Sequence, residues 1–355
     1  MKKASLLTLV VILVSSLVTG CGSTTSPSPS SSTSTSGVKD PATITIAWLP
    51  NNSGDNEKEF RDEFDNVITK ATGIKVENKL TTDYAIAISA LESGDAQLGY
   101  FGPNEYIVSH AKDPKVVPVV VESGDSGTLK DALYYSRFLV KKGNENQYKS
   151  GDGFDIDNIV GKKMSFVSTS STSGFNMPAA AILGKFTKQD KWKNLTKDGL
   201  AQGGNDKFFG QVLFAGSHQL SLVNVLTDKS DISAVDDIDV AQYVELSQGK
   251  DNETGAVYTV KQGADAPFNT LAGAQYEIIQ SIPVLNTPVE ANSAALSQKT
   301  LDAITQALTS DQTTNDPKIF APKGSKGSVF VQPHRFLKVE DSWYAPMRKV
   351  LGYTS

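Results

Sequence analysis

The sequence contains few of the residues that cross-link a chain or bind metals. Cys21 is the only cysteine, so no disulfide bond can form within the chain. Only three histidines are present, and no two of them have the spacing of a metal site. The Walker motif of nucleotide-binding proteins and the Gly-x-Ser-x-Gly motif of hydrolases are also missing. We therefore expect no metal and no cofactor.

An excess of basic residues is missing as well. The 355 residues include 34 Lys and Arg against 39 Asp and Glu, which gives a formal net charge of −5. This balance argues against nucleic acid as a partner. With 39% hydrophobic and 21% charged residues the composition is that of a globular protein, and the length suits one large or two medium domains.

The N-terminus has the pattern of an export signal. Lys2 and Lys3 precede an apolar run over residues 6–18, and the small residues Thr19 and Gly20 follow it. The apolar run is too short to be assigned to a membrane span. We therefore expect the mature protein to lie outside the cytoplasm.

The end of this signal, Val18-Thr19-Gly20-Cys21, resembles the lipobox of bacterial lipoproteins, with Val where Leu is more common. The resemblance implies cleavage before Cys21 and a diacylglyceryl group on its sulfur, so residues 1–20 would be a lipoprotein signal peptide. Their removal takes away two lysines and no acid, which lowers the formal net charge from −5 to −7. Acyl chains would then hold the protein to the cell membrane. The alternative is an ordinary secretory signal with a chance cysteine.

The signal is followed by a segment that cannot bury a core. Residues 22–40 read GSTTSPSPSSSTSTSGVKD and are mostly Ser, Thr and Pro. This composition is typical of a flexible linker. We expect a disordered Ser/Thr-rich tether over residues 21–41.

The folded part alternates strands with helices in two successive series. Such alternation predicts parallel-rich sheets with helices on both faces. In the first series we expect strands at 43–50, 74–80, 96–101 and 115–123, and helices near 60–72, 83–94 and 103–111. In the second we expect strands at 134–142, 162–168, 210–216, 230–236 and 275–285, a helix that begins between 173 and 177, helices at about 218–226 and after 236, and C-terminal helices such as 296–308.

Two long extended runs, 134–142 and 275–285, are placed to carry the chain between two lobes and back. Ligands of such sheets lie beyond the carboxyl ends of the strands, which here would face a cleft between the lobes.

Within the folded part, the densest group of hydroxyl side chains stands at one of these strand ends. Residues 169–174 read TSSTSG, directly before a helix that should begin between Ser173 and Met177, because Pro178 fits best in a first turn. Unpaired N–H groups of a helix N-terminus and rotatable hydroxyls can hold a small tetrahedral anion without a basic side chain. The alternative is a helix cap within a polar loop.

Other candidate site residues lie at strand ends or helix starts. His218 follows a strand and begins a helix, and Asp236 and Asp237 end another strand. An acid in the cleft could accept a proton from a protonated oxyanion or repel a fully ionised one, although acids at strand ends more often cap the next helix. Tyr84 and Tyr134 could supply hydroxyl donors, or could simply pack in the core.

Four blocks of the sequence, in this order, resemble one family. They are 83–106 (DYAIAISALESGDAQLGYFGPNEY), 171–174 (STSG), 215–218 (AGSH) and 281–288 (SIPVLNTP). Together they are similar to the substrate-binding proteins of phosphate, phosphite and phosphonate ABC transporters, and the resemblance extends over residues 43–355.

The resemblance implies a two-lobed type II periplasmic-binding-protein fold with the ligand in the interlobe cleft. Each lobe would be a mixed, mostly parallel sheet flanked by helices. Lobe 1 would comprise residues 42–136 and 284–355, and lobe 2 residues 137–283. We expect a monomer that delivers its ligand to ABC permease subunits and performs no chemistry on it.

The resemblance also implies which residues bind the ligand. The positions that match the family's site are Tyr84, Tyr134, Ser171, Thr172, Ser173 and His218, the last displaced by one because Ser217 is inserted. Asp236 is added from its place at a strand end. Members that bind aminoethylphosphonate carry two acids for its ammonium group, and this chain has Ile238 and Thr287 there. We therefore expect phosphate, phosphite or a simple alkylphosphonate to bind better than aminoethylphosphonate.

Three alternatives stay open from the sequence. One is a type II binding protein for another ligand, such as a sulfonate or a pyrimidine. Another is a sensor-type binding protein that reports occupancy to a membrane receptor. The third is an extracytoplasmic hydrolase that uses Ser171 or Ser173 as nucleophile with His218 and Asp236.

Overall fold

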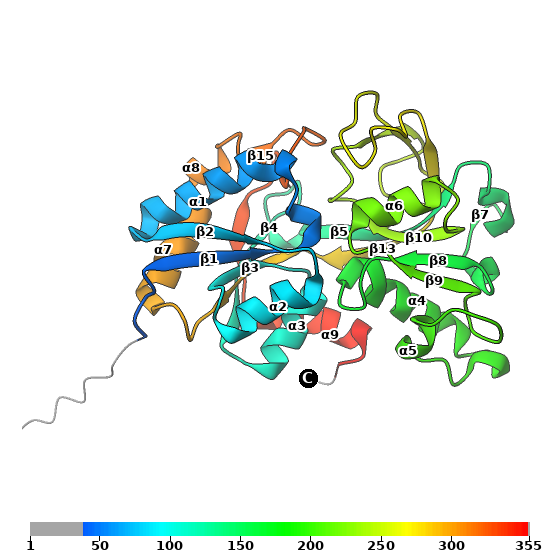
Figure 1. The fold of residues 1–355 in the computed structure, drawn as a ribbon, viewed down its shortest axis with the longest axis horizontal. Helices are drawn as coiled ribbons and strands as arrows, with labels where there is room; N and C mark the ends of the chain where they lie inside the picture. Colours follow the sequence, from blue (N-terminus) through cyan, green and yellow to red (C-terminus); the bar gives the residue numbers. More distant parts are fainter. Residues whose placement is uncertain (1–37, 354–355) are drawn as a thin grey trace, which may run out of the picture. The chain divides into compact units, whose positions relative to one another are not determined.

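The computed structural model describes residues 38–353 (Figure 1). The predicted signal peptide over 1–20, the lipidation site Cys21 and most of the predicted tether lie outside the described residues.

Glycines and prolines in the sequence mark the boundaries of the elements closely. Helix α1 (Lys58–Thr72), for example, ends where Gly73 adopts a left-handed conformation with φ of 72°. No helix among the described residues has both the length and the apolar content needed to cross a membrane.

The first lobe is built on a six-stranded sheet with the order β17-β4-β14-β3-β1-β2. Its strands are β1 (Thr43–Trp48), β2 (Lys75–Leu80), β3 (Leu98–Tyr100), β4 (Val116–Glu122), β14 (Pro288–Asn292) and β17 (Phe336–Lys338). Its helices are α1, α2 (Tyr84–Ser93), α3 (Pro103–Lys112), α7 (Gln298–Leu308), α8 (Asp311–Thr314) and α9 (Ala345–Leu351). The short strands β15 (Phe320–Ala321) and β16 (Phe330–Val331) pair beside it.

Two apolar layers sandwich this first sheet. Phe60, Phe64 and Ile68 of α1 pack with α7 against one face, whereas α2, α3 and α9 cover the other (Figure 1). Each of these fully buried side chains contributes about 1.5–3 kcal/mol relative to exposure. Apolar burial therefore fixes the face that each helix presents to the sheet, and with it the directions of the helix N-termini at the strand ends.

The second lobe is built on a seven-stranded sheet with the order β11-β12-β13-β5-β10-β8-β9. Its strands are β5 (Leu133–Lys141), β8 (Lys163–Phe166), β9 (Gln211–Phe214), β10 (Ile232–Asp236), β11 (Val244–Gln248), β12 (Val257–Val260) and β13 (Gln275–Leu285). Its helices are α4 (Met177–Phe186), α5 (Lys197–Leu200) and α6 (His218–Leu226), and a small hairpin is formed by β6 (Lys149–Ser150) and β7 (Gly153–Phe154). Helices α4 and α6 lie over opposite faces of this sheet.

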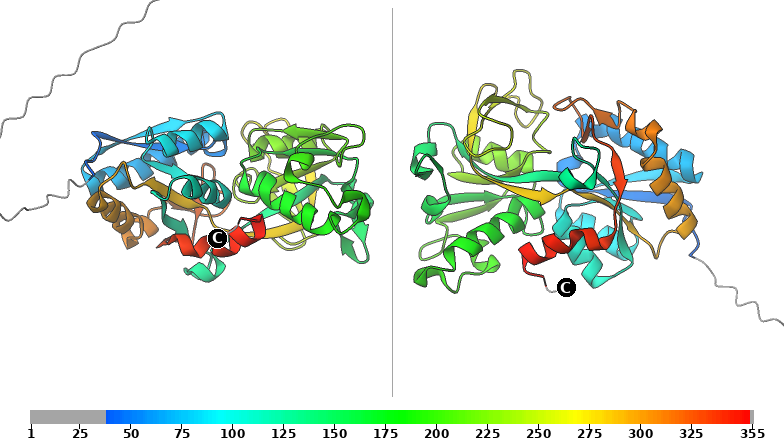
Figure 2. Two further views of the ribbon diagram at one scale, coloured as in Figure 1. Left: turned by 90° about the horizontal axis from the view of Figure 1, so that it is seen from below. Right: turned by 180° about the vertical axis from the view of Figure 1, so that it is seen from behind.

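Strands β5 and β13 form the long antiparallel pair that joins the lobes, with Leu133 opposite Leu285 and Lys141 opposite Tyr276 (Figure 2). The predicted crossing runs are therefore neighbours throughout their length. The predicted lobe boundaries, at 136/137 and 283/284, fall inside these strands, and we keep that division as a proposal.

Both sheets are mixed, as expected, but the expectation that they are mostly parallel is wrong. Parallel pairing is found for β2-β1-β3 in the first sheet and for β10-β8-β9 in the second. The other neighbours within these two sheets of the described chain are antiparallel, because β14, β5 and β13 return across the sheets from distant parts of the chain.

The helix expected after residue 236 is absent from the described structure. The Asp236 carboxylate instead accepts the backbone N–H of Asp239 at 3.1 Å and closes a turn. Further turns over Ile238–Tyr243 lead directly into β11, so a short polar connection takes the place of the helix.

The end of the predicted tether is attached to the first lobe. The Asp40 carboxylate accepts hydrogen bonds from the backbone N–H and hydroxyl of Ser297 and from the hydroxyl of Thr300, at 2.7–2.8 Å. These residues lie at the start of α7. The chain is therefore fixed from Asp40 onward, slightly earlier than the sequence indicates.

Candidate functional site

One small buried cavity brings the predicted ligand-binding residues together. It measures about 30 Å³. Its lining includes every ligand-binding residue predicted from the sequence: Tyr84, Tyr134, Ser171, Thr172, Ser173, His218 and Asp236. Each of these side chains is at most 5% exposed. None of the residues that line the cavity is Lys or Arg.

The hydroxyl-rich loop enters its helix through a wide π-type turn over Thr172–Asn176. The Asn176 N–H donates to the Ser171 carbonyl, and the Gly174 N–H donates to the Ser171 hydroxyl at 3.1 Å. A Cβ on Gly174 would lie 2.4 Å from a methyl carbon of Val167, so only glycine allows this close approach. The first N–H groups of such a turn have no partner within the helix. The Thr172 N–H interacts with the Glu105 carboxylate, which leaves that of Ser173 for the cavity.

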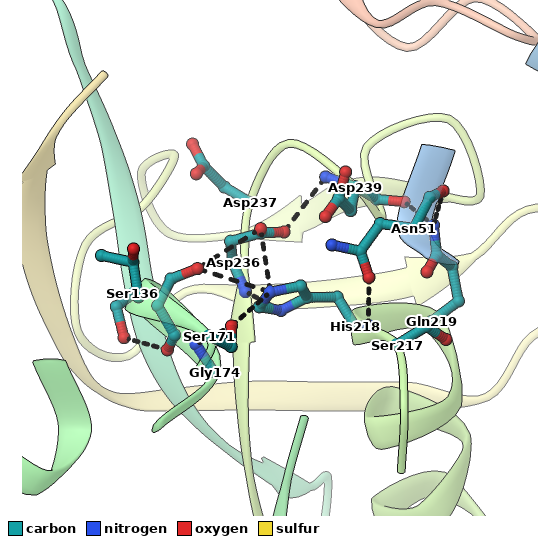
Figure 3. A network of polar contacts seen from close by, with 12 residues as sticks. Asn51, Ser136, Ser171, Gly174, Ser217, His218, Gln219, Asp236, Asp237 and Asp239 are labelled. Atoms are coloured by element: carbon teal, nitrogen blue, oxygen red, sulfur yellow. Dashed lines mark hydrogen bonds and ion pairs between the residues drawn. The ribbon is translucent and has the colours of Figure 1, made fainter. Parts of the chain in front are cut away.

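His218 offers a hydrogen-bond donor to the cavity. The Asp236 N–H donates to Nδ1 of His218 at 3.0 Å, so the neutral ring carries its proton on Nε2. Nε2 lies 3.5 Å from the Ser171 hydroxyl, 3.4 Å from that of Ser173 and 3.3 Å from a carboxylate oxygen of Asp236 (Figure 3). Burial lowers the pKa of His218 to about 3, helped by the charge of Arg137. The ring therefore stays neutral and donates over the physiological pH range.

This arrangement does not fit a serine hydrolase. In a catalytic triad the serine and the acid contact different nitrogens of the histidine, and the nitrogen that faces the serine is unprotonated. Here both serines and Asp236 face Nε2, which carries the proton, while Nδ1 is occupied by a backbone N–H. The same tautomer argues against a metal at the cluster of His218, Asp236 and Asp239, the group among the described residues with metal-ligand spacing.

The two tyrosines supply hydroxyl donors from different parts of the fold. Tyr84 begins α2 after its N-cap Asp83, and its hydroxyl oxygen accepts from the Asn51 side chain at 2.8 Å. Tyr134 lies on β5 beside Ser173. Burial raises the pKa of both tyrosines well above the ordinary value, so their hydroxyls stay protonated.

Acids face these donors from both lobes. Burial raises the pKa of Asp236 to about 6 and of Glu105 to about 7, and burial together with the charge of Asp236 raises that of Asp239 well above its ordinary range. Asp237 lies elsewhere: its carboxylate accepts from the Tyr135 N–H and the Asn252 amide, each at 2.8 Å, and it points away from His218 (Figure 3). The cavity thus combines neutral donors with acids that can hold a proton.

Direct hydrogen bonds close the two lobes over the cavity. The Asn104 N–H donates to the Thr172 hydroxyl at 2.7 Å, and the His218 N–H donates to the Asn51 side chain at 3.2 Å. The Asn52 amide donates to Asp239 at 3.3 Å. The described chain is therefore in a closed arrangement.

Sequence analysis missed four of these residues. Asn51 and Asn52 lie just beyond the end of β1, after Leu49 and Pro50, and the rule that ligands lie beyond strand carboxyl ends could have found them. Asp239 stands three residues after a predicted site acid. Glu105 gave no signal, because an acid in the first turn of a helix is ordinary.

A second, larger cavity of about 320 Å³ adjoins the first, and Tyr134 and Ile238 line both. Acids dominate its charged lining: Glu122, Asp125, Asp131, Asp237 and Asp251, with Lys323 and His334. Ile238 and Thr287, the positions aligned with the ammonium-binding acids of aminoethylphosphonate binders, both lie in the wall of the small cavity.

Comparison with known families and proteins places this site in context. The family model of the periplasmic substrate-binding protein of phosphonate ABC transporters matches residues 46–344. The chain is 27% identical over 194 residues to the phosphate-import protein PhnD of Mycolicibacterium smegmatis, and this alignment covers 54% of each chain. The chain thus matches about half the length of this curated relative.

Two solved structures are similar over most of the chain. PhnD1 from Prochlorococcus marinus in complex with methylphosphonate has a TM-score of 0.57 at 16% identity, with 88% of this chain and 97% of that chain covered. The binding protein component of a phosphonate ABC transporter from Pseudomonas aeruginosa has a TM-score of 0.58 at 14% identity, with 88% and 86% covered. At these identities the likeness is one of fold, that of the two-lobed type II periplasmic binding proteins.

Proposed function

The chain belongs to the family of phosphonate ABC-transporter substrate-binding proteins, and from this premise we propose that it binds a small phosphorus oxyanion for import. The proteins it resembles are transporter components rather than enzymes. The ligand would be phosphate, phosphite or a simple alkylphosphonate. Its partners would be the permease subunits of an ABC importer.

The observation that carries this proposal is the composition of the small cavity. Its donors are hydroxyls, the His218 Nε2–H and the helix N–H of Ser173, all of them neutral. Such donors can surround a tetrahedral oxyanion at a helix N-terminus. The size of the cavity, about 30 Å³, favours a small ligand over a sulfonate with a bulky group or a pyrimidine.

The acids favour an oxyanion that carries a proton. Asp236 can accept a hydrogen bond from a P–OH group, which phosphate keeps in both of its ionic forms near neutral pH and which phosphite and methylphosphonate keep in their monoanions. Sulfate is fully ionised there and can present only acceptors, so an ionised carboxylate repels it. The site would therefore select phosphorus oxyanions over sulfate.

Transport requires both closure and release. Ligand contacts from both lobes would favour the closed arrangement, because closure is stabilised by the difference in ligand affinity between the two states. Without a basic residue in the lining, the anion is held by hydrogen bonds alone. This arrangement suits a carrier that gives its ligand up to a permease.

The protein would be anchored outside the cytoplasm by a lipid on Cys21. Support comes from the sequence pattern at residues 18–21 and from the run of Ser and Thr that follows it.

A second candidate ligand class is favoured by the larger cavity. Its acidic lining, including Asp237 and Glu122, could face a cationic group on a substituted phosphonate whose oxyanion occupies the small cavity. The residues Ile238 and Thr287 argue against this ligand, because neither supplies a charge next to the oxyanion site. The two proposals predict different orders of affinity: aminoethylphosphonate binds more weakly than the simple oxyanions under the first, and equally or more tightly under the second.

A thermal-shift panel with calorimetry tests the proposal. The panel is phosphate, phosphite, hypophosphite, methylphosphonate, aminoethylphosphonate and sulfate. A ligand at about 100 times its Kd adds about 2.7 kcal/mol to the native state and raises the unfolding midpoint. We expect at least one of phosphate, phosphite and methylphosphonate to do so, sulfate to have no effect, and aminoethylphosphonate to bind more weakly.

Matched variants locate the binding. The double variant Ser171→Ala with Ser173→Ala should bind about tenfold or more weakly, because each lost hydrogen bond costs about 1 kcal/mol. Ser221→Ala removes a buried serine of the same lobe that lies outside the cavity, and should leave affinity unchanged. Absence of any oxyanion response would refute the function, and equal or tighter aminoethylphosphonate binding would favour the second candidate.

A further inference from the structure

Glu105 holds a hydroxyl that the oxyanion would need. The Thr172 hydroxyl donates to Oε2 of Glu105 at 2.5 Å, and its oxygen accepts the Asn104 N–H at 2.7 Å. A hydroxyl has one proton to donate. While Glu105 is ionised, its carboxylate accepts this hydrogen bond, so the Thr172 hydroxyl cannot donate to a ligand.

The contact is tightly packed and joins the two lobes. Glu105 lies in the first turn of α3 in the first lobe, and Thr172 lies in the π-type turn of the second. Both are buried, at 3% and 1% exposure, and both line the small cavity. A Cβ on Gly102 would lie 2.5 Å from the Thr172 hydroxyl and 2.7 Å from Oε2 of Glu105, so glycine permits the approach.

No cation among the described residues pairs with Glu105, because Lys112, which lines a surface pocket with it, pairs with Glu92 at 3.1 Å. Burial raises its pKa to about 7, against the lowering effects of the Thr172 hydroxyl and of the backbone N–H groups of Glu105 and Thr172. The titratable groups that interact with it or share the small cavity are Tyr84 on α2, Tyr100 on β3, Tyr134 on β5, Glu290 on β14, His218 on α6, Asp236 at the end of β10, Asp239 after it, and Tyr353 near the C-terminus. None of them is cationic near neutral pH, since His218 stays neutral.

An anion bound in the cavity therefore shifts the protonation equilibrium of Glu105. Two like charges in a buried site repel each other, so the bound anion favours the protonated acid. Protonated Glu105 can donate to the Thr172 oxygen, and the Thr172 proton can then turn toward the anion. The proton comes from solvent, remains on Glu105 while the ligand is bound, and returns to solvent when the ligand leaves.

We propose that Glu105 is a proton-linked specificity residue: the anion binds together with a proton taken up by Glu105, and this proton frees the Thr172 hydroxyl for the ligand. The inference rests on the proposed oxyanion-binding function. It assigns to one residue both a contribution to the lobe contact and a pH dependence of binding.

Proton uptake on binding tests this directly. Calorimetry with inorganic phosphate, or with methylphosphonate where the panel ranks it higher, is run in two buffers of different ionisation enthalpy at pH 6 and pH 8. Because the ligand also titrates, the informative quantity is the difference between the native chain and Glu105→Gln. At pH 8 the native chain should take up close to one more proton per ligand than the variant, and at pH 6 the difference should nearly vanish.

A buried acid in the same lobe supplies the control. Glu290 is fully buried outside the small cavity, and burial raises its pKa well above the ordinary range. Glu290→Gln should therefore keep the proton uptake of the native chain. Equal uptake by the native chain and Glu105→Gln at pH 8 overturns the inference alone, whereas no binding of any panel member overturns the proposed function with it.

A measurement on the native chain removes dependence on the folding of the variant. In an infrared difference spectrum of protein with ¹³C-labelled glutamate, ligand addition at pH 8 should produce a labelled band of a protonated carboxylic acid. No such band at saturating ligand would also overturn the inference.

Discussion

The acid that faces the neutral donors should decide between phosphate and sulfate, and Asp236→Asn tests this. Asp236 is 5% exposed, and its carboxylate lies 3.3 Å from Nε2 of His218. An oxyanion oxygen that accepts from His218 can therefore approach to roughly 4 Å from that carboxylate. Two unit charges at this distance repel by about 4 kcal/mol at an effective dielectric constant near 20.

Asparagine removes this repulsion and offers an amide donor of nearly the same shape. Sulfate should then bind about 100-fold or more tightly than it does to the native chain. Phosphate loses a hydrogen bond from its own P–OH group to a charged acceptor, which is worth about 1.5–3 kcal/mol, although the lost repulsion offsets part of this. We expect the ratio of sulfate to phosphate affinity to rise by about 100-fold.

Calorimetry at pH 7.5 and constant ionic strength measures both affinities. Asp237→Asn is the matched control, because this neighbouring acid points away from His218 and should leave the ratio unchanged. In the native chain, sulfate affinity should rise as pH falls through about 6, where Asp236 takes up a proton, and the variant should lack this rise. An unchanged ratio in Asp236→Asn would refute the assignment of selectivity to this carboxylate.

Two further predictions concern the anchor and the stability of the first lobe. Cys21→Ser should move the exported protein from the membrane fraction to the soluble fraction, and retention on the membrane would contradict lipid attachment at this residue. The second prediction concerns Glu290→Gln and is checked by denaturant unfolding. As pH rises from 4 to 8, the free energy of unfolding of this variant should increase relative to that of the native chain, by about 1.4 kcal/mol for each unit of pKa shift that the substitution removes. The sign follows from the raised pKa of Glu290: above pH 4.5 folding takes up a proton at this residue, so the native chain loses stability as pH rises. If the unfolding free energies of the variant and the native chain changed in parallel with pH, this prediction would be contradicted.

Local sequence signals predicted most of the helices and strands, because the residues at the ends of each element indicate where it begins and ends. Gly94 ends α2 in a left-handed conformation, and α6 and β13 have the bounds expected from periodicity. The failures occur where distant segments decide the structure. β14 inserts between β3 and β4 from far along the chain, and the turn closed by Asp236 replaces a helix that local pattern favoured.

The residues of the candidate site fall into the same two groups, those that local signals predict and those that distant segments bring in. The hydroxyl loop, His218 and Asp236 stand at strand ends, and strand order brings such ends together, so their grouping could be expected. Glu105 reaches the Thr172 hydroxyl only because the lobes close, and this contact joins residues far apart in sequence. No local pattern encodes such a contact.

The placement of the nearest buried cation explains how an acidic chain can discriminate among anions. Arg137 is 1% exposed on β5 and donates to the carbonyl of Asp236, with its guanidinium over the ring of Tyr258 at 5.4 Å, but it does not line the small cavity. Burial raises the pKa of Asp236 and lowers that of His218; the charge of Arg137 limits the first shift and adds to the second, which favours an ionised acid and a neutral imidazole. A cation inside the cavity would attract every anion, sulfate included. Behind the acid it sets protonation states instead, and under the proposed function selection would be left to the proton that the ligand carries.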